Sequence, residues 1–150
     1  MAMQHVAIYT KDLLRLTAFY CRYFGGEVLR ASENPRHQMV FIGFGSGCQL
    51  ELMSVPGMTG RPLPPGGEAL GITHLAFDAP STAYVRQVTE ELEKAGYTIR
   101  VRPRWYGRDY YESCFLDPDG NRVELSVPLE ALRAEQAADR SGKDGGGAEA

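Results

Sequence analysis

The sequence contains two similar halves, and this internal repeat constrains the fold more than any other feature. Each half opens with a short strand pattern that begins with histidine, at His5-Val6-Ala7-Ile8 and at His74-Leu75-Ala76-Phe77. Each half later reaches a strand pattern that contains Glu-Leu, at Glu51-Leu52 and Glu124-Leu125. The histidine and the glutamate are 46 residues apart in the first half and 50 residues apart in the second. We interpret the chain as the duplication of one structural unit.

The first half predicts one strand, then a helix, then three strands. Side chains alternate along residues 3–9, so that His5, Ala7 and Tyr9 share one face. A helix is expected over residues 12–24, because apolar side chains recur there at helical spacing and Asp12 can cap its start. The remaining pattern predicts strands over 27–31, 38–44 and 48–54, with turns at 32–35 and 45–47.

The second half predicts the same order of elements. Ser81 can cap a helix over residues 82–95, and Asp117-Pro118-Asp119-Gly120 is a strong hairpin signal. Strands are expected at 72–78, 97–102, 110–116 and 122–127. The fold class is therefore α+β, with two tandem βαβββ modules that form a curved mixed β-sheet trough with the helices on the outside. The apolar neighbours of Glu51 and Glu124 would meet the helices, so the histidines and glutamates would point into the trough.

The domain boundaries follow from changes in composition. We expect one domain over residues 1–128, with module one at 1–55, a linker at 56–71 and module two at 72–128. The 56–71 segment is rich in Pro and Gly and has no periodicity, which favours a linker over a lid that folds across a site. Residues 129–150 are expected to form a C-terminal tail, with a short helix followed by disorder.

Composition excludes several classes of protein. A net charge of −3 argues against a nucleic-acid-binding surface, which usually needs a basic excess. No apolar run approaches the roughly 20 residues that span a bilayer, and the first ten residues do not have the pattern of a signal peptide. Three scattered cysteines are too few for a disulfide framework, so we expect reduced thiols and a cytoplasmic protein without membrane partners.

The repeated histidines and glutamates predict a metal site. A lone histidine or glutamate is usually a surface or packing residue, but His5, Glu51, His74 and Glu124 recur at matched positions of both halves. Mixed nitrogen and oxygen ligands suit a divalent ion such as Ni, Zn, Co, Fe or Mn. Four protein ligands leave open positions for a small-molecule substrate with two neighbouring oxygens. The metal would stabilise an enediolate as a Lewis acid, and a glutamate could act as general base.

Two other features have simpler interpretations. The stretch Arg102–Tyr111 mixes arginines with aromatic residues and could hold an anionic substrate, but a solvated loop that covers a sheet edge or meets a partner chain is favoured. His37 lies outside the repeat and is expected to be a surface residue.

The motifs together resemble the vicinal oxygen chelate superfamily, which includes glyoxalase I, extradiol dioxygenases, fosfomycin-resistance enzymes and bleomycin-binding proteins. The similarity covers roughly residues 3–127. The motifs that carry it are His5-Val6-Ala7-Ile8, Asp12-Leu13, Phe19-Tyr20, Phe24-Gly25-Gly26, Leu50-Glu51-Leu52, Gly71-Ile72-Thr73-His74-Leu75-Ala76-Phe77, Phe115-Leu116-Asp117-Pro118-Asp119-Gly120-Asn121 and Val123-Glu124-Leu125.

The order His, Glu, His, Glu is most similar to that of bacterial glyoxalase I. The resemblance implies that the four residues are metal ligands, that Glu51 or Glu124 is the base, and that the chain is a lactoylglutathione lyase-like enzyme. It departs from that family at Tyr9, where an arginine is usual, and at Val55, where an asparagine is frequent; both help to hold glutathione there.

Alternatives within the superfamily remain open. One is another metalloenzyme: an extradiol dioxygenase, an epoxide thiol transferase or an epimerase. Another is a drug- or metabolite-binding protein of the bleomycin-resistance type, although such members usually lack the metal ligands. The resemblance also implies a homodimer, in which the four ligands come from one subunit or from two.

Overall fold

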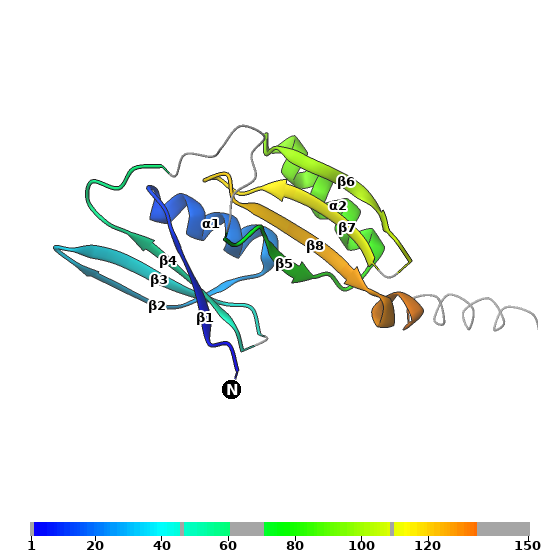
Figure 1. The fold of residues 1–150 in the computed structure, drawn as a ribbon, viewed down its shortest axis with the longest axis horizontal. Helices are drawn as coiled ribbons and strands as arrows, with labels where there is room; N and C mark the ends of the chain where they lie inside the picture. Colours follow the sequence, from blue (N-terminus) through cyan, green and yellow to red (C-terminus); the bar gives the residue numbers. More distant parts are fainter. Residues whose placement is uncertain (1, 46, 61–70, 109, 135–150) are drawn as a thin grey trace, which may run out of the picture. The chain divides into compact units, whose positions relative to one another are not determined.

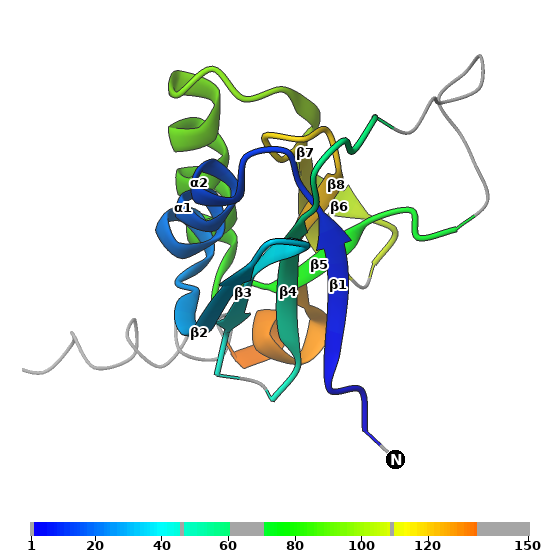
Figure 2. The same cartoon turned by 90° about the vertical axis from the view of Figure 1, so that its left-hand side faces the viewer.

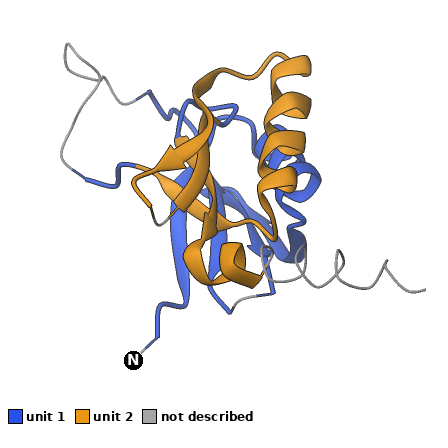
Figure 3. Ribbon diagram, turned by 90° about the vertical axis from the view of Figure 1, so that its right-hand side faces the viewer, with its two compact units in different colours: residues 1–73, 117–121 blue, residues 74–116, 122–150 orange. Residues whose placement is uncertain are grey.

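The computed structural model describes residues 2–45, 47–60, 71–108 and 110–134 (Figure 1). Contacts within the chain divide it into two compact units (Figure 3). Unit 1 comprises Met1–Thr73 together with Asp117–Asn121, and unit 2 comprises His74–Leu116 together with Arg122–Ala150. Most of each unit is therefore one half of the sequence repeat.

Unit 1 contains a four-stranded mixed sheet with one helix against it (Figure 2). The strand order is β1-β4-β3-β2, with β1 parallel to β4 and the other pairs antiparallel. The helix packs against the central strands. The elements are β1 (His5–Tyr9), α1 (Leu13–Phe24), β2 (Glu27–Asn34), β3 (His37–Gly43) and β4 (Gln49–Ser54).

The boundaries of α1 follow from its end residues. The Asp12 carboxylate accepts a hydrogen bond from the Arg15 amide, and this caps the first turn. Gly25 ends the helix with φ 64°, a conformation that costs glycine little. The face of α1 that turns to the sheet buries Leu16, Phe19, Tyr20 and Tyr23, and the sheet buries Val40, Ile42, Leu50 and Leu52.

Unit 2 repeats this arrangement. Its sheet has the order β5-β8-β7-β6, with β5 parallel to β8, and α2 packs on it. Ser81 caps α2 by accepting a hydrogen bond from the Tyr84 amide. Its elements are β5 (Leu75–Asp78), α2 (Thr82–Lys94), β6 (Ile99–Tyr106), β7 (Tyr110–Leu116) and β8 (Arg122–Pro128).

These observations confirm the α+β class and the two βαβββ modules. The trough that the modules would form together stays a prediction, as do the proposed domain boundaries. Most of the expected linker, at residues 61–70, and the tail beyond residue 134 lie outside the described residues. Residues 129–134 are helical, as expected for the start of the tail.

Three predicted boundaries differ from the structure by three residues or more. β2 extends to Asn34, because the Asn34 side chain accepts hydrogen bonds from the Arg36 and His37 amides. The turn therefore lies at residues 35–36 instead of 32–35. β5 starts at Leu75 rather than at residue 72. β6 extends to Tyr106, so residues 102–106 form a strand where we expected a loop.

The three cysteines are free thiols, as expected. None of the helices within the described part of the chain is both long and apolar enough to cross a membrane.

Candidate functional site

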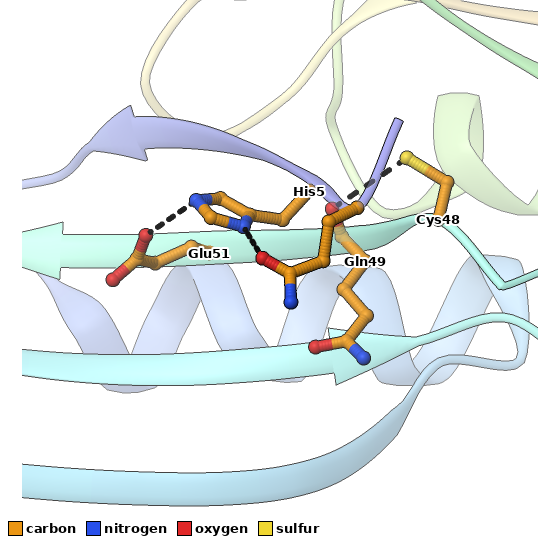
Figure 4. A network of polar contacts seen from close by, with 5 residues as sticks. His5, Cys48, Gln49 and Glu51 are labelled. Atoms are coloured by element: carbon orange, nitrogen blue, oxygen red, sulfur yellow. Dashed lines mark hydrogen bonds and ion pairs between the residues drawn. The ribbon is translucent and has the colours of Figure 1, made fainter. Parts of the chain in front are cut away.

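In unit 1, His5 and Glu51 form a close pair (Figure 4). The imidazole Nε2 lies 3.3 Å from the Glu51 Oε2. On the other side of the ring, Nδ1 lies 3.1 Å from the side-chain oxygen of Gln4. An Nδ1–H that donates to Gln4 leaves the Nε2 lone pair facing the carboxylate. Two electron-rich atoms then face the same point, which is the arrangement that a cation stabilises.

Strand register brings this pair together. In the parallel β1–β4 pairing, the Cα partner of Glu51 is Ala7 and that of Gln49 is His5. His5 and Glu51 are therefore diagonal neighbours on the same face of the sheet. Glu51 is largely buried in the sheet, since only 9% of its surface is exposed.

Unit 2 contains an equivalent pair. His74, the residue just before β5, places its Nε2 3.3 Å from the Glu124 Oε2 on β8. Here Ala76 is the Cα partner of Glu124, just as Ala7 is the partner of Glu51. The sequence repeat is therefore also a repeat of side-chain geometry, with an alanine opposite each glutamate.

The separation in each pair is compatible with joint coordination of one metal ion. At 3.3 Å it is longer than the usual N–H···O range of about 2.7–3.2 Å. Two ligands that lie about 2.1 Å from one cation, at an angle of about 90–110°, are about 3.0–3.4 Å apart. Imidazole and carboxylate are also the donor types that divalent transition metals accept. The residues of each pair therefore fit a metal ion.

No larger ligand group is formed within the residues that the structure describes. No three His, Cys, Asp or Glu side chains come together there in a way that could hold a metal ion. Each unit brings together the two predicted ligands of its own half. His37 stays apart from both pairs: it starts β3 and contacts Asn34.

A pocket adjoins the His5–Glu51 pair in unit 1. Its volume is about 470 Å³, within the range of small-molecule sites. The Phe41 ring meets the His5 ring edge to face, with centroids 5.5 Å apart. The lining residues are His5, Arg30, Ala31, Ser32, Met39, Phe41 and Glu51. Sequence analysis did not identify Arg30, although an alternating pattern carried through β2 would have placed it on this face.

Unit 2 has an additional acidic residue near its pair. Burial raises the pKa of Glu112, and the charge of Glu124 raises it further, while Arg104 and His74 act in the opposite direction. The electrostatic environment of Glu124 therefore includes a second carboxyl group. Sequence analysis missed Glu112, whose alternation along β7 places it on the same face as Glu124.

Fold and site together define a class of protein with two βαβββ modules, each of which carries one His–Glu pair, with the histidine on or just before the first strand of the module and the glutamate on its last strand. A sequence profile of the Glyoxalase/Bleomycin resistance protein/Dioxygenase superfamily matches residues 2–125. The chain belongs to this superfamily, as its motifs indicated.

The individual relatives share between 23% and 31% of their aligned residues with this chain. The chain is 27% identical over 136 residues to a lactoylglutathione lyase of Salmonella typhimurium, which covers 89% of this chain and 97% of that protein. A glyoxalase family protein from Enterococcus faecalis is 31% identical with a TM-score of 0.64, covering 83% of this chain and 96% of that one. The trypanothione-dependent glyoxalase I of Leishmania major has a TM-score of 0.69 at 23% identity, covering 96% and 98% of the two chains, and this likeness shows the fold alone.

Proposed function

We propose that the protein is a metal-dependent lyase or isomerase of the glyoxalase I type. Its substrate would be a hemithioacetal or a related molecule with two neighbouring oxygens. The observation that carries this proposal is the pair of His–Glu contacts, both at 3.3 Å and at equivalent places of the two modules. The similarity to a lactoylglutathione lyase, at 27% identity, supports the same reaction class.

The proposed ligands of the divalent metal are His5, Glu51, His74 and Glu124. Because each module supplies only two of them, the set needs two modules, from one chain or from two copies of it. We propose a homodimer in which the pairs complete one another. The bound cation, one of Ni, Zn, Co, Fe or Mn, would supply Lewis acidity that stabilises negative charge on the vicinal oxygens of the substrate.

A glutamate of the site would move the proton. The Glu51 or Glu124 carboxylate takes the proton from the carbon that bears the hydroxyl and the sulfur. It returns this proton to the neighbouring carbon, which was the carbonyl carbon. The hydroxyl proton passes to the former carbonyl oxygen, so the product is a 2-hydroxy thioester and no other reactant is consumed.

The first experiment is an activity survey. Metal-loaded protein is mixed with methylglyoxal and either glutathione or other small thiols, and thioester formation is followed by its absorbance. We expect turnover with at least one thiol and loss of turnover after chelation. Absence of turnover with every thiol, in a sample shown to contain metal, would reject the proposal.

Variants then separate metal binding from proton transfer. His5→Ala and His74→Ala should each reduce metal content at least about tenfold, as loss of a direct ligand does. Glu51→Gln and Glu124→Gln should differ: the variant of the base loses turnover more than it loses metal. His37→Ala is the matched control and should keep full metal content, as measured by elemental analysis. Retention of metal in both histidine variants would contradict the assignment.

A further inference from the structure

One charged side chain of the unit 1 pocket has no role in the reaction described so far. Arg30 lies on β2 and lines the pocket together with His5 and Glu51. In the sheet its Cα partner is Phe41, which in turn pairs with Glu51 on β4. Arg30 therefore lies on the same face as the His–Glu pair, two strands away.

The flat face of the Arg30 guanidinium packs on the Phe41 ring, and the N–H donors at its edges have no partner within the described residues. Its central carbon lies 3.7 Å from the centre of the Phe41 ring, which is a close cation–π stack. Within the described residues, Arg30 makes no ion pair and its guanidinium no hydrogen bond. Stacking occupies the face of a guanidinium, whereas its five N–H donors point outward in the plane. The donors of Arg30 are thus available to a ligand.

The polar groups of the pocket lie close to one aromatic ring. Phe41 on β3 meets the His5 ring with centroids 5.5 Å apart, and the Arg30 guanidinium carbon lies 3.7 Å from the centre of the same ring. Neighbouring strands are about 4.8 Å apart, so the backbone of β2, which carries Arg30 and Ser32, lies about 10 Å from that of β4, which carries Glu51. A ligand that contacts both strands would offer oxygens to the His5–Glu51 pair and a negative charge to Arg30.

We propose that Arg30 binds an anionic group on the substrate, most simply a carboxylate carried by the thiol component. This inference rests on the proposed function and narrows it to hemithioacetals of acidic thiols. A carboxylate matches the guanidinium edge in two parallel hydrogen bonds, which a neutral group of the same size cannot form. Arg30 is a specificity-determining residue and takes no part in the proton transfer.

The kinetic test uses two thiols that differ only in charge. Hemithioacetals of methylglyoxal are prepared with 3-mercaptopropionate and with the neutral 3-mercaptopropionamide. In the wild type, kcat/KM should be about 10- to 100-fold higher for the acid, the range expected for a hydrogen-bonded ion pair. Arg30→Gln should remove this preference by raising KM for the acid, with little change in kcat and little change for the amide.

Two further variants separate substrate recognition from packing. Arg30→Lys keeps the charge without the planar pair of donors and should restore only part of the preference. Arg22 is the matched control, since its guanidinium carbon lies 5.2 Å from the Tyr23 ring centre and it does not line the pocket. Arg22→Ala should leave the preference unchanged. If the effect of Arg30→Gln were only structural, both substrates would lose kcat/KM equally, and that result would overturn the proposal.

A binding experiment makes the inference independent of turnover. Metal-free protein is titrated with 3-(methylthio)propanoate and with its amide, and binding is followed by ligand NMR. The acid should bind the wild type more tightly than the amide does, the difference should shrink with salt, and it should vanish in Arg30→Gln. This result without any lyase activity would overturn the proposed reaction and keep the anion site. Turnover without any acid preference would overturn the anion site and keep the reaction.

Discussion

Tyr20 and Asp117 form a buried contact that ties helix α1 to the turn between β7 and β8. The Tyr20 hydroxyl donates to Asp117 Oδ2 at 3.0 Å, and both residues are almost fully buried. Asp117 also accepts hydrogen bonds from the Asp119 amide and from the amide and side chain of Asn121. We expect Tyr20→Phe to destabilise the protein, because it removes one of four donors to a buried carboxylate.

The size of this effect follows from the charge of the acceptor. A hydrogen bond to an ionised group contributes about 1.5–3 kcal/mol, whereas a bond between neutral groups contributes about 0.5–1.5 kcal/mol. At neutral pH Tyr20→Phe should therefore lower the free energy of unfolding by about 1.5–3 kcal/mol. For a urea m-value of about 2 kcal/mol/M, the unfolding midpoint falls by about 0.8–1.5 M.

The effect should depend on pH in a defined direction. Burial raises the pKa of Asp117 above its ordinary value of 3.8, and its hydrogen bonds oppose this. The folded protein then holds this proton more tightly than the unfolded chain, so wild-type stability falls as pH rises from 3.8 through the raised pKa. Because the Tyr20 bond favours the ionised form, the cost of Tyr20→Phe should be largest above that pKa and smaller below it.

Urea unfolding followed by circular dichroism, at several pH values from about 3.5 to 7, measures both quantities. Tyr84→Phe is the control, since Tyr84 is half-buried and its hydroxyl makes no hydrogen bond in the part of the chain that the structure describes. Its cost should stay below about 0.5 kcal/mol at every pH. If Tyr20→Phe behaved like this control, or cost the same at both ends of the pH range, our reasoning about the charged acceptor would be wrong.

Three further predictions concern other buried sites. In Gly26→Ala the new Cβ would lie 2.5 Å from the Ile42 side chain, so the urea midpoint should fall by an amount equivalent to about 1–3 kcal/mol, and an unchanged midpoint would contradict the close packing. Thr89→Val removes the hydroxyl that lies 2.8 Å from that of fully buried Ser113 and should cost about 1–3 kcal/mol in thermal unfolding; an unaltered melting temperature would argue against this pairing. Burial raises the pKa of the Cys114 thiol, so iodoacetamide should label it more slowly in the folded than in the unfolded chain, and equal rates by peptide mass spectrometry would refute this.

Much of the fold could be predicted from local pattern. Both helices start where Asp12 and Ser81 can cap them, and their apolar stripes correctly identify the buried faces. Alternation placed Glu51 and Glu124 on the faces opposite the core leucines and valines. These signals are local, since a cap or an alternating strand needs only a few neighbouring residues.

The errors came from features that depend on pairing between strands. We expected a loop after residue 102, yet Pro103 lies in β6, an edge strand whose register shifts between Val101 and Arg104. An edge strand tolerates proline because one side of its ladder has no partner strand. Likewise, ending β2 at Ala31 left Arg30 near the end of a hairpin instead of opposite Phe41. The pocket could not be predicted without the correct register.

Sequence analysis also missed one buried residue. Asp117 was recognised only as part of a turn signal, whereas the structure buries its carboxylate against Tyr20, 97 residues away in the sequence. A contact over that separation leaves no local pattern. The His–Glu pairs could be predicted because the duplication shows the same two residues twice.

The strand order places both imidazoles at an edge of their sheets, with His5 on β1 and His74 just before β5. Among the strands that the structure describes, β1 and β5 are edge strands, each paired with one neighbour. An outer strand can detach without disturbing the rest of the ladder, and such local opening costs far less than global unfolding. A cation held by His5 and Glu51 would fasten β1 to β4 as a cross-link does. Loading with metal would therefore slow the exchange of the β1 backbone amides with solvent.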